Sequence, residues 1–117
     1  CIRDRDYRYL FVGAAHNNSG RNAPLQGILK LDLQTGKREL HSFAGSGYVS
    51  EPVFVPKPNG TREDEGWILT LVYDGSKHRS DLVILDGENI QGDAVAKLHL
   101  QHHIPYGLHG SWTDKVF

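Results

Sequence analysis

The chain has 117 residues, with 13 basic side chains against 14 acidic ones and a formal net charge of −1. This length suits a single domain with one core, and no lysine or arginine block provides the positive surface that nucleic acid binding needs. The longest apolar runs, such as ILTLVY at 68–73, are much shorter than the roughly 20 residues of a membrane-spanning helix. The sequence therefore predicts neither a nucleic acid partner nor a membrane span within the chain.

The two ends of the chain favour a piece cut from a larger protein. The sequence contains no methionine, starts at Cys1 in the charged stretch CIRDRDYRY, and stops at Phe117 soon after its densest motif. A processed mature chain is the alternative. With one cysteine no internal disulfide can form, and together with the lack of a signal peptide this favours a reducing, cytoplasmic location.

Short apolar runs between turn residues predict an all-β protein. No stretch keeps a helical period for three turns, and Gly, Asn, Asp, Ser and Pro clusters separate the runs, as in the DG pairs at 74–75 and 86–87. In chain order, the predicted strands are 7–14, 26–34, 37–43, 50–56, 66–74, 80–88 and 94–100.

The polar stretch KPNGTREDEG at 57–66 connects two of these strands. Charged side chains are rarely buried unless they are paired. We therefore expect its charge run, REDE, to form a solvated loop tip.

An internal repeat links the two halves of the chain. The series YLFVGA, GILKLDLQTG and KRELHSF recurs as ILTLVYD, DLVILDGENIQGD and AVAKLHL, and ILKLDL at 28–33 precedes LVILDG at 82–87 by 54 residues. A period of about 50 residues with three or four strands per unit is typical of β-propeller blades, which must stack because one blade cannot cover both its faces. Two repeats cannot close a ring. We predict that residues 1–47 end one blade, 48–100 form the next, and 101–117 lead into a closing strand.

Seven histidines raise the question of a metal site, because neutral imidazole is a common ligand of iron, zinc and copper. No pair has a diagnostic metal spacing, and the HxxH at 99–102 lies at a strand end. We interpret six as structural or solvent-facing: His16, His41, His78, His99, His102 and His103. His109 differs because Gly107 and Gly110 flank it, and glycine lets a backbone approach a crowded centre. The residues alone leave His109 open between a ligand and a structural histidine.

Glu51 opens the predicted strand EPVFVP and is followed by Pro52, which suits a strand start because it has no N–H to donate. A glutamate that leads into a buried strand needs a partner. The residues leave two interpretations open, an exposed strand-end carboxylate or a functional one. Since no nucleophile elbow or phosphate-binding loop is present, we predict no catalytic side chain in this chain.

Three blocks, SEPVFVPKPNGTREDEGWILTLVYD, SDLVILD and HHIPYGLHGSW, closely resemble in order and spacing the C-terminal part of the carotenoid cleavage oxygenase family, most of all its bacterial apocarotenoid-cleaving members. The strong similarity covers residues 48 to 113, and YRYLFVGA and ILKLDLQTG fit more loosely. The resemblance implies a seven-bladed propeller, of which this chain is a C-terminal portion of about one and a half blades plus a closing strand.

The resemblance also implies a non-haem ferrous iron, Fe(2+), held by four histidines on the propeller axis. His109 matches the histidine of the family's PYGxHG motif, and Glu51 matches one of three glutamates that support such ligands. Glu51 is then expected to accept the free N–H of the His109 imidazole, which fixes the ring and raises its basicity. Tyr106, Leu108 and Trp112 either shape the substrate cavity or pack around the motif.

The implied reaction is cleavage of a conjugated carbon–carbon double bond of a carotenoid or apocarotenoid by O2, giving two carbonyl products. Membrane-surface contact would come from regions outside this chain, and no partner protein is inferred. Because the other three histidines and two glutamates have no counterpart here, we expect the isolated chain to be inactive. Ser111 and Ser50 depart tolerably from the family pattern, Ser50 standing where glycine is common. A propeller scaffold without iron and a stilbene-cleaving oxygenase remain alternatives.

Overall fold

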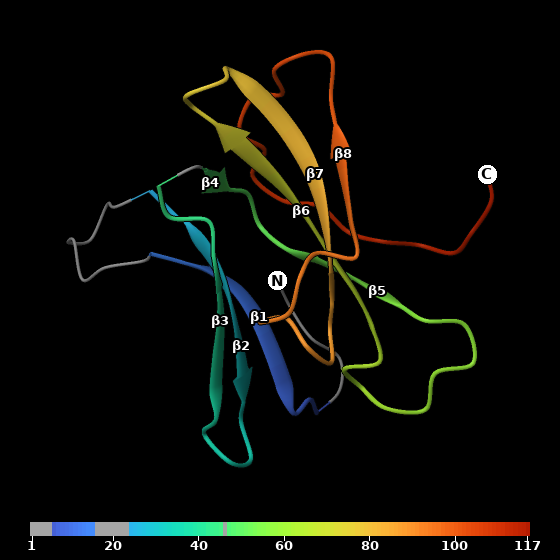
Figure 1. Ribbon diagram of the computed structural model, residues 1–117. Coiled ribbons are helices and arrows are strands. Elements are labelled where there is room, and N and C mark those ends of the chain that lie inside the picture. Colours follow the sequence, from blue (N-terminus) through green and yellow to red (C-terminus); the bar gives the residue numbers. More distant parts are fainter. Residues whose placement is uncertain (1–5, 16–23, 46) are drawn as a thin grey trace.

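The computed structural model describes residues 6–15, 24–45 and 47–117, and these form two antiparallel sheets (Figure 1). Within these residues all the regular structure is β, and no helix is long and apolar enough to cross a bilayer. The strands are β1 (Tyr9–Ala14), β2 (Gly27–Asp32), β3 (Arg38–Ser42), β4 (Tyr48–Val49), β5 (Val53–Pro56), β6 (Gly66–Asp74), β7 (Arg79–Asp86) and β8 (Ala96–His99). The predicted all-β class is confirmed.

The first sheet is a meander in which β2 lies between β1 and β3. Asp32 ends β2 and starts the turn to β3, because its Oδ1 accepts hydrogen bonds from the N–H groups of Gln34 and Thr35. Asp86, 54 residues later, ends β7, and its Oδ1 likewise accepts a hydrogen bond from the N–H of Glu88. Such aspartate turns hold the backbone at a strand end, and Asp74 makes the same kind of turn after β6.

The second sheet has the strand order β4-β6-β7-β8, and β5 also pairs with β6. Along β6 buried and half-buried residues alternate over nine positions, as they do in a strand with one face against a core. The hydrophobic core draws on both sheets and consists of Ile28, Phe43, Val49, Ile68, Val72, Val83, Leu85 and Ile90. Burial of each such side chain stabilises the fold by roughly 1.5–3 kcal/mol.

A one-residue bulge separates β4 from β5, which are two pieces of the same edge strand. Val49 lies opposite Val72 and Val53 lies opposite Leu69, so that residues 50–52 face only two residues of β6. An extra residue of this kind moves every following side chain to the other face of the sheet. Val49 and Phe54 therefore both pack in the core although they are five positions apart.

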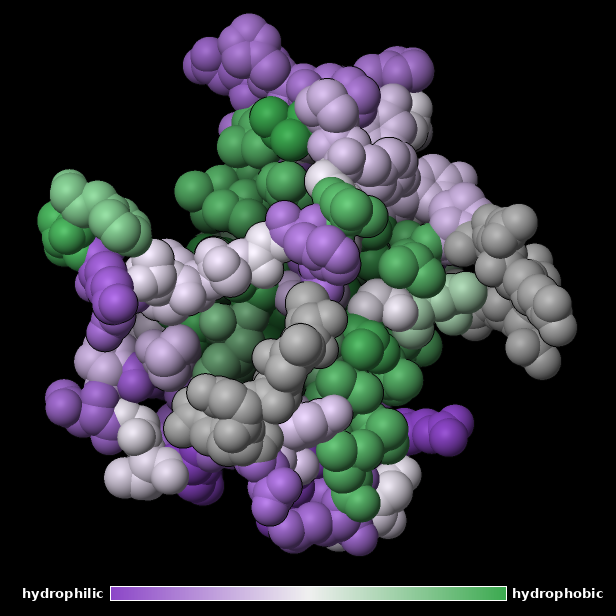
Figure 2. Space-filling model, turned by 180° about the vertical axis from the view of Figure 1, so that it is seen from behind, coloured by the Kyte–Doolittle hydropathy of each residue, from purple (hydrophilic) through white to green (hydrophobic). Residues whose placement is uncertain are grey.

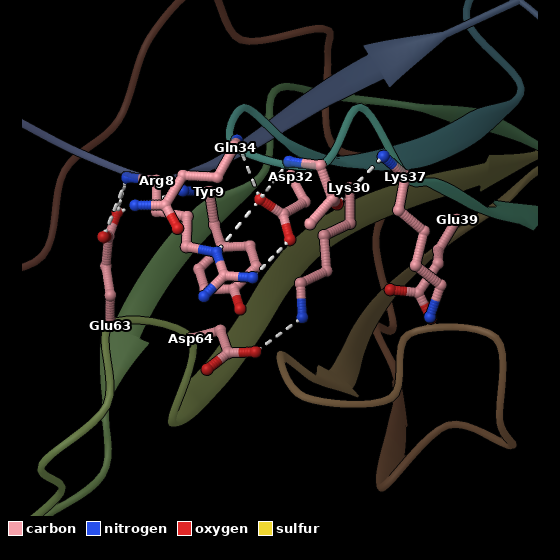
Figure 3. A network of polar contacts seen from close by, with 10 residues as sticks. Arg8, Tyr9, Lys30, Asp32, Gln34, Lys37, Glu39, Glu63 and Asp64 are labelled. Atoms are coloured by element: carbon pink, nitrogen blue, oxygen red, sulfur yellow. Dashed lines mark hydrogen bonds and ion pairs between the residues drawn. The ribbon is translucent and has the colours of Figure 1, made fainter.

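The charged loop between β5 and β6 connects the two sheets (Figure 3), and the predicted solvated tip is only partly confirmed, because Arg62 and Glu63 are exposed whereas Asp64 is buried. Asp64 is buried, and its Oδ2 accepts a hydrogen bond of 2.7 Å from Lys30 Nζ, on β2. The exposed Glu63 carboxylate accepts the backbone N–H of Arg8 at 2.9 Å. The physical reason is that a buried lysine is costly unless an anion pairs with it, and here the loop supplies that anion.

The seven predicted strands are all present, most of them shorter at the ends, but two details differ. β4 was not predicted, and residues 50–52 lie in the bulge outside any strand. Residues 101–117 form no strand and pair with neither sheet. A strand needs a neighbouring edge for its N–H and C=O groups, so the prediction that this segment leads into a closing strand stays a prediction.

Large apolar side chains are exposed along this last segment: Ile104, Tyr106, Leu108, Trp112, Val116 and Phe117. The face of the molecule in Figure 2 shows apolar side chains across its middle, between hydrophilic upper and lower margins. Exposed apolar side chains that gather on one face commonly mark a place where another surface or a ligand packs.

Candidate metal centre

Glu51 and His109 meet at the bulge of the second sheet. The carboxylate comes from the bulge itself, and the imidazole comes from the segment that follows β8 and returns to that sheet. His109 Nδ1 lies 2.8 Å from Glu51 Oε2, across 58 positions of sequence. The structure thus brings together the two residues that the sequence singled out.

The direction of this hydrogen bond leaves one ring nitrogen for a metal. With Nδ1–H donating to the carboxylate, Nε2 carries the lone pair, which is the arrangement found in carboxylate–histidine–metal sites. The two side chains are 63% and 41% exposed, so Nε2 is not enclosed by the described residues. No lysine or arginine among these residues pairs with Glu51, so no other charge competes for the carboxylate.

Ser80 holds the returning segment against the second sheet. The N–H of Ile104 donates to Ser80 Oγ at 2.9 Å, and the N–H of Leu100 donates to the Ser80 carbonyl at 3.0 Å. The ring of His103 packs against that of Tyr73, with centroids 4.8 Å apart. These contacts fix the path of the chain a few residues before His109.

Two hollows border the pair. A cavity of about 160 Å³ is lined by Glu51 and His109 together with Gly107, Leu108 and Gly110, and by Ser50, Val53, Thr70 and Leu71 of the sheet. A larger hollow of about 620 Å³ is lined mainly by apolar residues of β1 and its neighbours, and by Glu51, Tyr106 and Leu108. Of the three predicted cavity residues, Tyr106 and Leu108 therefore line a hollow, and Trp112 lines neither of these two.

The glycines that flank His109 are not crowded in this structure. A Cβ on Gly107 would meet no atom within 4 Å, and one on Gly110 would approach a Val53 methyl group at 3.4 Å. Neither glycine has a positive φ. The expected close approach of the backbone at these two glycines is thus absent among the described residues.

The other histidines that the structure describes do not converge on a metal site. His41 Nδ1 contacts the Ile90 carbonyl at 2.6 Å, His78 Nδ1 contacts the Tyr73 hydroxyl at 3.2 Å, and His99 Nδ1 contacts Asp81 at 2.8 Å. His16 lies outside the described residues. Within those residues no group of three or more His, Cys, Asp or Glu side chains could hold a metal ion. Among the described residues, His109 is left with a ring nitrogen, Nε2, whose lone pair is free for a single metal bond.

Two residues of the site were missed from the sequence, namely Ser50 and Thr70, whose hydroxyl groups bond to the backbone at the bulge. Pro52 was the available signal, because proline inside a sheet is confined to edges and bulges.

Comparison with known proteins assigns the family. Residues 2–114 match the family described as retinal pigment epithelial membrane protein, RPE65. The chain belongs to this family of carotenoid cleavage oxygenases. It is 57% identical over 110 residues to apocarotenoid-15,15'-oxygenase of Synechocystis sp., covering 94% of this chain and 22% of that protein. It is 38% identical over 98 residues to resveratrol cleavage oxygenase 1 of Aspergillus fumigatus, covering 83% of this chain and 20% of that protein.

The solved structures of the carotenoid cleavage oxygenase family share the fold of this chain. The crystal structure of cobalt-substituted Synechocystis apocarotenoid oxygenase superposes with a TM-score of 0.89 at 56% identity, covering 95% of this chain and 23% of that one. The predicted family and the predicted β-propeller fold are confirmed. The chain spans about a fifth of the length of these relatives.

Proposed function

We propose that this chain is part of a non-haem iron(II) oxygenase that cleaves a conjugated carbon–carbon double bond of an apocarotenoid or carotenoid with O2, giving carbonyl products. In it, His109 supplies one of the iron ligands. The 2.8 Å contact between His109 Nδ1 and Glu51 Oε2 carries the proposal, because this pairing orients an imidazole for a metal. The 57% identity to a protein named apocarotenoid-15,15'-oxygenase supports the substrate class.

The residues present fit such an iron. Ferrous iron on an imidazole site supplies an open position for O2. Glu51 accepts the Nδ1 proton of His109, holds the ring in the tautomer with a free Nε2, and increases the electron density on that nitrogen. One imidazole does not retain iron alone, so the isolated chain is expected to be inactive.

The larger hollow beside Glu51 fits an apolar substrate. Its wall contains Phe11, Val12 and Leu25 from the first sheet side and Tyr106 and Leu108 from the returning segment. Apolar walls bind a polyene by excluding water from it. Because Glu51 lines both hollows, a polyene in this one would lie next to the ligand pair.

A stilbene is the second candidate substrate. The protein named resveratrol cleavage oxygenase 1 shares 38% identity with this chain. The lower identity favours the apocarotenoid, but the aromatic and aliphatic side chains of the hollow could accept either conjugated molecule.

The test uses the complete protein, loaded with ferrous iron and given an apocarotenoid or resveratrol under O2. Mass spectrometry is expected to show a pair of carbonyl products from the apocarotenoid. His109→Ala is expected to abolish both product formation and iron retention. Wild-type iron content in His109→Ala would show that His109 is not an iron ligand. Cleavage of resveratrol but not of the apocarotenoid would select the stilbene as substrate. A wild-type protein that binds no iron would favour a propeller scaffold.

A further inference from the structure

Glu51 is the middle one of the three bulge residues, 50–52. The direction of its side chain therefore depends on what stabilises the bulge. In a regular strand, Glu51 would point to the same face as Val49, toward the core. The extra residue among 50–52 breaks this alternation and lets the carboxylate reach the returning segment that carries His109.

A bulge leaves backbone groups of the two strands without their ladder partners, and here two hydroxyl groups bind them. The N–H of Leu71 donates to Ser50 Oγ at 3.0 Å, where a regular ladder would use the Ser50 carbonyl. That carbonyl instead accepts the Thr70 hydroxyl at 3.1 Å. The Ser50 N–H still donates to the Leu71 carbonyl at 2.9 Å, and Pro52 has no N–H to satisfy.

Thr70 is an unusual residue for its place in the sheet. It lies on β6 between Ile68 and Val72, on the face that packs in the core, and is only 2% exposed. A buried hydroxyl is costly unless it is hydrogen-bonded, and its shortest hydrogen bond goes to the Ser50 carbonyl, beside Glu51.

We propose that the hydroxyl groups of Ser50 and Thr70 fix the bulge in the form that aims the Glu51 carboxylate at His109, so that both are positioning residues for this imidazole. The inference rests on the proposed role of His109 as an iron ligand. The Ser50 side chain offers an acceptor for the Leu71 N–H that a glycine at this position could not provide.

The first experiment measures ferrous iron affinity of the complete protein. Loss of a residue that hydrogen-bonds a metal ligand typically costs about 10–100-fold in affinity. Since Ser50 and Thr70 act through Glu51, Thr70→Val and Ser50→Ala are expected to weaken iron binding by about threefold to tenfold. Thr70→Ser keeps the donor and is the matched control, with affinity expected within about twofold of wild type.

A double-mutant cycle separates positioning from a general effect on the sheet. In a Glu51→Gln background, Thr70→Val is expected to cause no further loss of iron affinity, because the carboxylate it would position is gone. A loss of the same size in both backgrounds would overturn the proposal, and so would wild-type affinity in Thr70→Val alone.

Amide hydrogen exchange of the metal-free protein tests the hydrogen bonds of the bulge independently of iron. The Leu71 amide is expected to exchange faster in Ser50→Ala than in wild type, because it loses its acceptor. An unchanged exchange rate of the Leu71 amide in Ser50→Ala would by itself overturn the proposal that Ser50 fixes the bulge. A wild-type protein that binds no iron would refute the proposed function. If in that case the Leu71 amide still exchanged faster in Ser50→Ala than in wild type, the hydrogen bonds of the bulge would be real but would serve the fold alone.

Discussion

Two histidine–carboxylate pairs in this chain share the same contact and differ in their surroundings. His109 Nδ1 lies 2.8 Å from Glu51, and His99 Nδ1 lies 2.8 Å from Asp81. Asp81 also accepts a 2.9 Å hydrogen bond from Arg79 Nε, and its side chain is only 9% exposed. Glu51 has no such cation among the described residues.

The difference shows why an imidazole beside a carboxylate is not by itself a metal site. Asp81 pairs with His99 in regular strand register between β7 and β8, and the Arg79 guanidinium already offsets its charge. Glu51 lies in a bulge, and its charge is available to polarise the ring of His109. The first arrangement stabilises a sheet edge, while the second, in the proposed function, orients a metal ligand.

The largest difference between the two pairs is expected when their carboxylates are replaced and iron affinity is measured. In the complete protein, Glu51→Gln is expected to lower iron affinity by about 10–100-fold, since the amide cannot match the charge of the carboxylate. Asp81→Asn, the matched change in the other pair, is expected to leave the affinity within about twofold. Metal titration followed by analysis of bound iron measures both, and an equal loss in the two variants would contradict the distinction.

For the free energy of unfolding the order is expected to be reversed, with the larger loss when Asp81 is replaced and the smaller loss when Glu51 is replaced. Asp81→Ala removes the partner of Arg79 and His99 and is expected to lower the free energy of unfolding by about 1–3 kcal/mol. Glu51→Ala removes an exposed carboxylate and is expected to change it by no more than about 0.5 kcal/mol. Denaturant unfolding of the metal-free protein is the measurement, because bound iron would itself stabilise the fold.

Acid is expected to distinguish the pairs further. Burial raises the pKa of Asp81, but hydrogen bonds and charge from His99 and Arg79 outweigh it, so the net pKa lies below 3.8. A lowered carboxyl pKa contributes stability that is complete above the unfolded value and is lost as pH falls through the folded one. The difference in free energy of unfolding between wild type and Asp81→Asn is therefore expected to become smaller below about pH 4. A difference that stays constant with pH would contradict this assignment.

The smallest effect is expected at His99. Its side chain is 55% exposed, and exposed ion pairs contribute little. His99→Gln is expected to lower the unfolding free energy by less than about 0.5 kcal/mol and to leave iron content at the wild-type level. Loss of iron in His99→Gln would place His99 in the metal site and remove the contrast with His109.

The strands could be predicted from the sequence because alternation and turn residues are local signals. The bulge was missed, because residues 50–56 read as one continuous run, and the local hint, Pro52, fits a strand start as well as a bulge in which 50–52 face only two residues of β6. The burial of Asp64 was also hidden, since its partner Lys30 is 34 positions away. Glu51 and His109 were found only through family resemblance, because spacing alone left each of them open.

The contact between Glu51 and His109 joins an early part of this chain to a late one. The bulge needs only β4, β5 and β6, whereas His109 follows β8. In a protein that folds from its N-terminus during synthesis, the carboxylate can be in place before the imidazole has been made. Iron capture through His109 would then fasten a finished sheet and could not serve as its folding nucleus.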